Sequence, residues 1–325
     1  MRIVMMGTGL FAEPTFEALL ASSHTVAGLV TQPDRLVGQE RGSTRQTGKG
    51  MKNIAQDHGV PVLQPDSINT PEGVAGLRTW QPELLVVAAY GQILSREVLE
   101  SAPRGGINVH ASLLPKYRGA APIQWAIWHG EMRTGVTIIR MTTGLDAGDM
   151  LAQEAVEIGP EETAGELEAR LAPLGARLAI RVVDQITAGT AQGVKQDAAQ
   201  VTKAPKMKKE HGAIDWTRTA AQVCNHVRAM QPWPTPYTFW HRAGSEPLRL
   251  IVLKATTRAG APQESAVPGT ILVQSDLSHL SVVAGAGGIV DIVELQPAGK
   301  KRMSASEVLR GRRPQPGDRL GPETA

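Results

Sequence analysis

The chain has almost no cysteine: Cys224 is the single one among 325 residues. A lone thiol excludes an internal disulfide and favours a reducing compartment. Long apolar runs are also missing, because no stretch approaches the roughly 20 apolar residues of a membrane-spanning helix. The opening MRIVMMGTG reaches glycine too early for the apolar core of a secretory signal peptide. We therefore expect a soluble, cytoplasmic protein with no membrane partner.

Aromatic residues are sparse, at 4% of the chain, and neither sign of charge dominates, with 34 Lys and Arg against 31 Asp and Glu. The balance hides an asymmetry: residues 1–205 carry 18 basic against 21 acidic side chains, whereas residues 206–325 carry 16 against 10. A basic excess confined to one domain is typical of a protein that binds a polyanion, although solvated surface lysines explain so modest an excess equally well. The histidines show no spacing typical of zinc ligands, so we expect no metal.

The length favours two domains, and the first part of the chain alternates short apolar runs with helical patterns. This alternation is typical of a Rossmann-like parallel sheet built from β/α/β units. We expect strands at 2–6, 25–30, 61–63, 84–89 and 106–109, a late hairpin at 134–141 and 150–158, and helices at 11–22 and 163–187.

The pattern changes after a polar segment broken by Gly and Pro. A helix at 220–230 ends at a proline-rich run, and short strands are expected at 248–254, 269–274, 279–283 and 289–295. Short strands at this spacing predict a small OB-like β-barrel. The predicted organisation is a catalytic domain at 1–189, a linker at 190–209, an OB-like domain at 210–313 and a loose tail at 314–325.

The first strand ends in a G-x-G-x-x-A turn formed by Gly7, Gly9 and Ala12. A dinucleotide site uses such a turn, but it also needs an acid at the end of the second strand to hold the ribose. That strand ends Val30-Thr31-Gln32, so a tight strand-to-helix turn explains the glycines better than a nicotinamide site does.

The sequence GGINVHASLLPKYRGAAPIQ at 105–124 carries the strongest chemical signal. Asn108 and His110 are two residues apart on a predicted strand, so their side chains project from the same face. The strand ends in a Pro/Gly-rich loop at the edge where open parallel sheets bind ligands. An amide can donate to a developing oxyanion, and an imidazole can donate or carry a proton. Asp146, in the glycine-flanked run GLDAGD, is either a third member of this set or a turn-capping aspartate.

Taken together, these motifs resemble the folate-dependent formyltransferases. The resemblance rests on Asn108-x-His110, on SLLP at 112–115 followed by Arg118-Gly119, and on Asp146 in its loop. Further segments resemble the members that act on methionyl-tRNA: TQPDR at 31–35, VAAYG at 87–91, AAPIQ at 120–124, IDW at 214–216, PWP at 232–234 and QPAGKK at 296–301. These matches extend over nearly the whole chain.

The resemblance implies transfer of a formyl group from 10-formyltetrahydrofolate to the amino group of initiator methionyl-tRNA, in a formyltransferase domain followed by the OB-like barrel. Asn108, His110 and Asp146 would be the catalytic residues. The folate site would be formed by Ser112, Leu113, Leu114, Pro115, Tyr90 and Gly91. The partners would be the acceptor end of the tRNA and the folate, and the chain would act as a monomer.

The resemblance also implies that tRNA phosphates are bound by a basic loop and by the basic clusters of the second domain. The residues expected to do so are Arg35, Arg41, Arg45, Lys49, Lys206, Lys208, Lys209, Lys300 and Lys301. The loop departs from the family pattern, since it has LVGQERG at 36–42 where Pro-Ala-Gly-Arg-Gly-Lys-Lys is common. The equivalence of Arg41 to the family's loop arginine is therefore open by a residue or two.

Other functions compete with this one. Relatives with the same chemistry formylate a purine precursor or a nucleotide-linked amino sugar. The purine enzymes resemble the catalytic domain alone, and the sugar enzymes lack the AAPIQ run and the basic loop. A nicotinamide dehydrogenase would rest on the glycine turn only. A non-catalytic RNA-binding module would leave Asn108, His110 and Asp146 unexplained.

Overall fold

The computed structural model describes residues 1–34, 49–259 and 266–324. The chain divides into two compact units. The first contains Met1–Ala126, Met132–Ile158 and Glu166–Lys206, and the second contains Ile127–Glu131, Gly159–Gly165 and Met207–Ala325. Two short segments of the first half of the chain therefore belong to the second unit.

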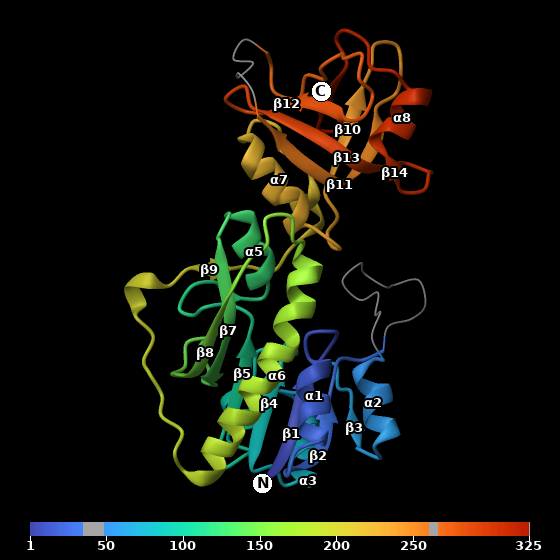
Figure 1. Cartoon of the computed structure of the whole chain (residues 1–325). Coiled ribbons are helices and arrows are strands. Elements are labelled where there is room, and N and C mark those ends of the chain that lie inside the picture. Colours follow the sequence, from blue (N-terminus) through green and yellow to red (C-terminus); the bar gives the residue numbers. More distant parts are fainter. Residues whose placement is uncertain (35–48, 260–265, 325) are drawn as a thin grey trace. The chain divides into compact units, whose positions relative to one another are not determined.

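A seven-stranded, mostly parallel sheet forms the centre of the first unit, in the order β3-β2-β1-β4-β5-β7-β8 (Figure 1). The first five strands of this order are parallel, and β7 and β8 form an antiparallel hairpin at one edge. The strands are β1 (Arg2–Gly7), β2 (Thr25–Val30), β3 (Val62–Leu63), β4 (Leu84–Ala88), β5 (Gly106–His110), β7 (Arg133–Arg140) and β8 (Met150–Glu157). The Rossmann-like sheet predicted from the sequence is confirmed.

The central strands are mostly apolar because the sheet is covered on both faces. Every residue of β4 is buried, as are residues 3–7 of β1. The helices of this part of the chain are α1 (Glu13–Leu20), α2 (Met51–Asp57), α3 (Pro71–Thr79), α4 (Arg96–Leu99), α5 (Pro122–Trp128) and α6 (Ala164–Ala188). Gly175 brings α6 close to the sheet, since a Cβ there would lie 2.7 Å from Cγ1 of Val109 on β5.

A six-stranded antiparallel sheet forms the second unit, with the strand order β12-β13-β11-β10-β15 and β14 paired to β13. The strands are β10 (Tyr237–His241), β11 (Leu248–Arg258), β12 (Leu280–Val283), β13 (Ile289–Pro297), β14 (Met303–Ser304) and β15 (Arg319–Gly321). Isolated bridges from Thr270 to Arg319 and from Ile271 to Val282 join the two edges, so the sheet is nearly closed into the predicted barrel. The helices α7 (Ala220–Ala229) and α8 (Ala305–Gly311) begin at capping boxes on Thr219 and Ser304.

Several expectations need correction. The segment 269–274 makes isolated bridges instead of a regular strand, whereas β10, α8 and β15 were not predicted. The tail is not loose: β15 pairs with β10, and Leu320 is buried in the barrel core. Burial of the Leu320 side chain stabilises this strand, although the turn-forming Pro314-Gln315-Pro316-Gly317 precedes it.

The segment expected to be a linker makes ordered contacts for most of its length. Val194 exchanges two backbone hydrogen bonds with Met150, and β9 (Lys203–Ala204) pairs in parallel with β6 (Arg118–Gly119). The segment up to Lys206 thus belongs to the first unit. Among the described residues, no helix has both the length and the apolar character needed to cross a membrane.

Candidate active site

The carboxyl end of β5 carries Asn108 and His110, on the strand next to β4. Ile107, which precedes Asn108, and Val109, which lies between Asn108 and His110, are buried among the apolar side chains of the sheet. The alternation of a strand therefore turns the amide and the imidazole away from this packing and toward the same side. The shared face inferred from the sequence is present.

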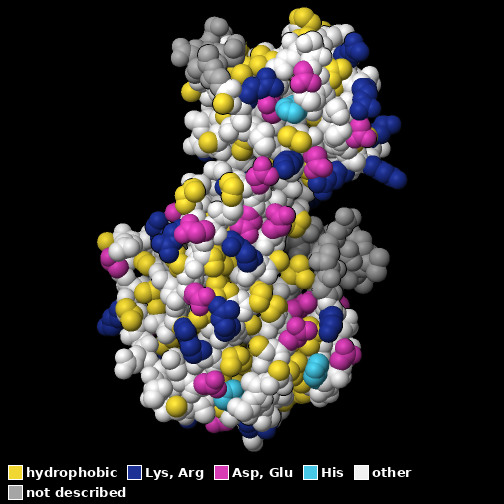
Figure 2. Space-filling view, viewed as in Figure 1, with side chains coloured by type: hydrophobic (Ala, Val, Ile, Leu, Met, Phe, Trp, Pro, Cys, Tyr) yellow, Lys and Arg dark blue, Asp and Glu magenta, His cyan; other side chains and the backbone are white. Residues whose placement is uncertain are grey.

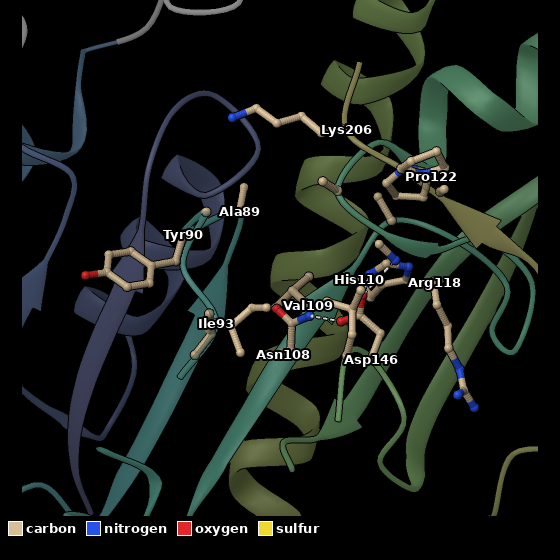
Figure 3. A pocket seen from close by; sticks show the side chains of 18 of the residues that line it. Ala89, Tyr90, Ile93, Asn108, Val109, His110, Arg118, Pro122, Asp146 and Lys206 are labelled. Atoms are coloured by element: carbon tan, nitrogen blue, oxygen red, sulfur yellow. Dashed lines mark hydrogen bonds and ion pairs between the residues drawn. The ribbon is translucent and has the colours of Figure 1, made fainter. Parts of the chain in front are cut away.

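Asp146 joins these two side chains from the connection between β7 and β8 (Figure 3). The Nδ2 of Asn108 donates to its Oδ1 at 3.1 Å, and the backbone N–H of Gly119 donates to its Oδ2 at 2.9 Å. The Nδ1 of His110 lies 3.6 Å from the same Oδ2. The structure thus brings together the amide, imidazole and carboxylate predicted from the sequence, and Asp146 is held by more contacts than a turn cap would need.

The ring of His110 is buried and has a defined tautomer. Its Nε2 lies 2.9 Å from the carbonyl oxygen of Tyr117. A carbonyl only accepts hydrogen bonds, so Nε2 must carry a proton. In the neutral ring Nδ1 is then the basic nitrogen, and it faces Asp146.

These three residues border a cavity of about 820 Å³ that lies within the first unit. Much of its lining is apolar, and Ile93 and Leu145 expose their side chains beside the polar cluster. Cavities of this size and character are typical of sites for small molecules. Tyr90 and Gly91, which the resemblance assigns to the folate site, line the cavity. Burial raises the pKa of the Tyr90 phenol to about 12, and its hydroxyl has no hydrogen-bond partner among the described residues.

Residues 112–115, also expected in the folate site, are not among the residues that line this cavity. Their contacts hold the loop after β5: Thr137 donates to the carbonyl of Ser112 at 2.7 Å and accepts from the N–H of Leu114 at 3.2 Å. Gln153 donates to the carbonyl of Leu114 at 3.0 Å. The loop is thereby fixed against the β7–β8 hairpin. A direct contact of these four residues with folate stays a prediction.

Three charged residues of the cavity lining were given no site role from the sequence: Arg118, which was named only as part of the motif, Glu168 and Lys203. Burial raises the pKa of the Glu168 carboxyl above its ordinary value, and within the described part of the chain it has no hydrogen bond or ion pair. Glu168 lies on α6. Because charged residues are common on an amphipathic helix, the sequence does not indicate that this one lines a cavity. Lys203 lies in a segment whose contacts with β6 are not visible in the sequence.

The basic residues expected to bind tRNA are distributed over both units. Lys206 lines the cavity, whereas Lys208 and Lys209 begin the second unit, and Lys300 and Lys301 are exposed on the turn between β13 and β14. Lys49 is exposed, with its Nζ 3.7 Å from Glu17. Arg35, Arg41 and Arg45 lie outside the described residues. Figure 2 shows Lys and Arg side chains standing out along one edge of the second unit, with acidic side chains between them.

The glycine turn after β1 is explained by packing. A Cβ on Gly7 would lie 2.8 Å from Cβ of Ala12 and 2.8 Å from the carbonyl oxygen of Ala88. Only glycine lets β1, the following helix and β4 approach this closely. No group of three or more His, Cys, Asp or Glu able to hold a metal ion occurs among the described residues.

Comparison with known proteins points to one family. The formyl transferase family model matches residues 1–183, and that of the formyl transferase C-terminal domain matches residues 206–313. The methionyl-tRNA formyltransferase of Solibacter usitatus is 43% identical over 321 residues, which covers 99% of each chain. That of Geobacter sulfurreducens is 44% identical over 99% of this chain and 97% of its own.

Solved structures show the same fold at low sequence identity. The sugar 3N-formyl transferase WlaRD, solved in the presence of dTDP and 5-N-formyl-THF, superposes with a TM-score of 0.65. The match covers 93% of this chain and 99% of that one, at 17% identity. On the full-length matches to its closer relatives, this chain belongs to the methionyl-tRNA formyltransferases of the formyl transferase family.

Proposed function

We propose that this enzyme transfers the formyl group of 10-formyltetrahydrofolate to the free amino group of initiator methionyl-tRNA, in the cytoplasm. The observation that carries the proposal is the convergence of Asn108, His110 and Asp146 on one cavity. This convergence occurs in a chain whose relatives align with it from end to end. The monomeric state expected from the sequence stays a prediction.

The cavity suits a folate. Its volume, about 820 Å³, falls in the range that encloses most of a drug-sized ligand, and its apolar walls suit aromatic rings. Asn108, His110 and Asp146 form a polar cluster on its wall, so one part of a ligand would meet hydrogen-bonding groups while other parts lie against apolar side chains. The structural relative WlaRD was solved with a formylated folate. The folate supplies an activated one-carbon unit, and the residues of the chain orient it and move protons.

Asn108 would act on the charge that develops during transfer. As the amine nitrogen bonds to the formyl carbon, negative charge gathers on the formyl oxygen. Nδ2 of Asn108 uses one hydrogen for Asp146, so its second hydrogen is free to donate to that oxygen. Loss of one such donor costs about 3 kcal/mol of transition-state stabilisation.

The proton of the attacking amine would move to Nδ1 of His110, the basic nitrogen of the ring. The carboxylate of Asp146 would stabilise the imidazolium that results. When the bond between the formyl carbon and the folate nitrogen breaks, the same proton is returned to that nitrogen. The reaction therefore balances without a metal or an oxidant: one C–N bond forms, one breaks, and one proton is carried across.

The acceptor would be recognised through its phosphates. The residues we expect to bind these phosphates are Lys206, which lines the cavity, Lys49, Lys208, Lys209, Lys300 and Lys301, together with Arg35, Arg41 and Arg45. Lysine and arginine side chains bind phosphate oxygens and position a nucleic acid without reading its sequence. Support comes from the exposure of Lys300 and Lys301 and from the basic excess of residues 206–325.

A transfer assay tests the acceptor directly. The purified enzyme is given 10-formyltetrahydrofolate with a labelled formyl group, together with methionyl-tRNA, free methionine or a nucleotide-linked amino sugar. We expect label on methionyl-tRNA and background levels on the other two. Transfer to the amino sugar at a rate equal to or above that on methionyl-tRNA would overturn the proposal.

A further inference from the structure

Asp146 holds its position in the site with an unfavourable backbone conformation. Its φ is 46°, in the left-handed region that residues with a Cβ rarely adopt. Such a conformation persists only where surrounding contacts hold it in place. The carboxylate contacts with Asn108 and Gly119 hold the side chain, and a separate contact holds the backbone.

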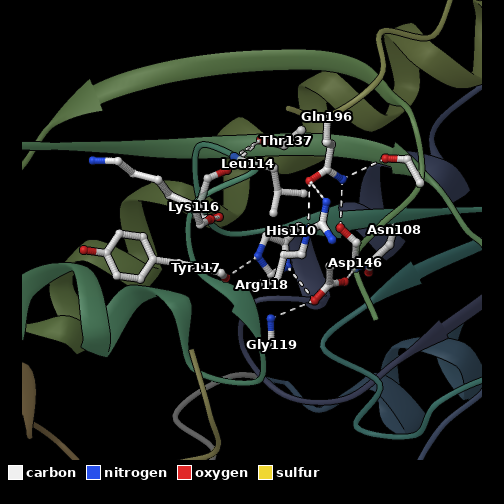
Figure 4. Close-up of polar contacts among 12 residues, drawn as sticks. Asn108, His110, Leu114, Lys116, Tyr117, Arg118, Gly119, Thr137, Asp146 and Gln196 are labelled. Atoms are coloured by element: carbon white, nitrogen blue, oxygen red, sulfur yellow. Dashed lines mark hydrogen bonds and ion pairs between the residues drawn. The ribbon is translucent and has the colours of Figure 1, made fainter. Parts of the chain in front are cut away.

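That contact comes from Gln196, which lies on the segment after α6 (Figure 4). Its Nε2 donates to the carbonyl of Asp146 and to the carbonyl of Gly148, both at 2.8 Å. Its Oε1 accepts from Nε of Arg118 at 3.0 Å and from Nη2 at 2.8 Å. Both hydrogens and both lone pairs of the amide are used, and because arginine only donates and carbonyls only accept, the amide fits in one orientation.

We infer that Gln196 is a positioning residue that fixes Asp146 relative to the groups it works with. The amide nitrogen and the amide oxygen of Gln196 bind two different parts of the site. One end holds the β7–β8 connection that carries Asp146. The other holds Arg118, whose neighbour Gly119 donates its backbone N–H to the Asp146 carboxylate. The inference rests on the proposed role of Asp146 in the transfer.

The segment that carries Gln196 is itself well anchored. Two residues before it, Val194 exchanges backbone hydrogen bonds of 2.8 and 2.9 Å with Met150. One residue after it, Asp197 caps a short 3-10 helix by accepting from the N–H of Ala199 at 2.9 Å. Gly193 permits the close approach, since a Cβ there would lie 2.8 Å from Cβ of Asp149. A side chain anchored on both sides can transmit a fixed position to the loop it holds.

Two substitutions test the inference in the full-length enzyme. Gln196→Met keeps the length of the side chain and removes all four hydrogen bonds. Gln196→Glu keeps an acceptor for Arg118 but turns a carboxylate oxygen toward two carbonyls, which releases the loop. Gln192→Met and Gln192→Glu are the matched controls, because the side chain of Gln192 is exposed on the same segment and makes no hydrogen bond or ion pair with another described residue.

For both Gln196 variants we expect kcat to fall about 10- to 100-fold, the usual result of displacing a reacting group by around an ångström. The KM values for methionyl-tRNA and for 10-formyltetrahydrofolate should stay within about threefold, since Gln196 is not among the residues that line the cavity. The Gln192 variants should match the unmodified enzyme. Circular dichroism and thermal unfolding establish that each variant is folded before kcat is compared.

A double variant separates positioning from a general structural role. If Gln196 acts through Asp146, Asp146→Asn combined with Gln196→Met should be no slower than Asp146→Asn alone, whereas independent effects would multiply. A kcat within about twofold of the unmodified enzyme in a folded Gln196→Met variant, or multiplying effects in the double variant, overturns the inference. An Asp146→Asn enzyme with full turnover would instead refute the proposed catalytic role of Asp146.

Discussion

Asp146 in the first unit and Asp318 in the second are both largely shielded from solvent, with side chains that are 11% and 2% exposed. The surroundings of the two carboxylates differ. Asp318 accepts from Nε1 of Trp240 at 3.0 Å, from Nη2 of Arg242 at 2.8 Å and from the N–H of Gln315 at 3.1 Å. All three of these partners belong to the second unit. Asp146 accepts from an amide and a backbone N–H but borders an open cavity and a histidine.

The contrast separates a carboxylate that we propose to act in the transfer from one that has a structural role. Burial alone would raise the pKa of Asp318, but the hydrogen bonds from Arg242, Gln315 and Trp240 hold it below its ordinary value. Its partners are donors that stay charged or polar at all ordinary pH values, so its state is fixed. Asp146 faces Nδ1 of His110, and an imidazole is able to take up and release a proton during catalysis. Access to a ligand and a neighbour that can change its charge mark the functional site.

The largest effect is expected from the site itself. Replacing Asn108 or His110 by alanine should lower kcat about 100- to 1,000-fold, because Asn108 would donate to the developing oxyanion and His110 would accept the proton of the amine. The midpoint of thermal unfolding should change little for Asn108→Ala, whereas His110→Ala should lower it because it removes a buried ring and the hydrogen bond to the Tyr117 carbonyl. Single-turnover transfer to methionyl-tRNA measures the chemical step. Variants that keep more than a tenth of the turnover would remove the distinction drawn between Asp146 and Asp318.

The opposite result is expected for Asp318→Asn. Loss of the charge leaves Arg242 with a weaker partner, and we expect the free energy of unfolding to fall by about 2 kcal/mol, while kcat stays unchanged below the unfolding temperature. Denaturant unfolding followed by tryptophan fluorescence measures the loss. Reduced kcat in the folded variant would show that Asp318 is more than structural.

The effect of Asp318→Asn on the free energy of unfolding should depend on pH. The pKa of Asp318 is lower in the folded chain than the ordinary value of 3.8, so the stability it contributes is present above pH 3.8. This contribution is lost as the pH falls through the pKa of the folded state. The difference in stability between the unmodified enzyme and Asp318→Asn should therefore shrink as the pH is lowered from about 5 toward about 3. A constant difference would contradict the low pKa of Asp318.

The sequence predicted the long elements and the convergence of Asn108, His110 and Asp146, because strand alternation and the resemblance both point to them. It did not predict the anchoring of the site. Gln196 contacts Arg118 and Asp146, which are 78 and 50 residues away in the chain, and no local pattern encodes such pairs. The strand β15 was missed for a related reason: its place depends on Leu320 fitting into the barrel core, while the local Pro and Gly favour a loop.

The effect of salt on ligand binding would sharpen the contrast between the two units. Binding of methionyl-tRNA should weaken about tenfold or more between roughly 50 and 200 mM salt, because bound lysines and arginines displace counterions from the phosphates. Binding of the folate, which we propose to occupy the mainly apolar cavity, should change far less. Fluorescence titration of each ligand at several salt concentrations gives both slopes. Equal slopes would mean that phosphate contacts contribute little to tRNA binding.

The smallest effect is expected from the turn between β13 and β14, where Lys300 and Lys301 are exposed. The turn is well formed: the N–H of Lys300 donates to the carbonyl of Pro297 at 3.0 Å, and the side chain of Gln296 donates to the carbonyl of Lys300 at 3.0 Å. The two ammonium groups are thus displayed on a fixed turn. Lys300→Ala combined with Lys301→Ala should raise the KM for methionyl-tRNA about fivefold and reduce the salt slope by roughly one for each phosphate that is no longer bound.

The matched control removes two exposed basic side chains from the first unit, Arg181→Ala with Lys195→Ala, neither of which is assigned to the tRNA. The net charge of the two double variants is the same, so a general electrostatic effect would raise both KM values alike. A specific contribution from the turn raises only the first and leaves the KM for folate and kcat unchanged in both. If the control weakens tRNA binding as much, the basic excess of the second unit acts through its overall field and the turn holds no phosphate.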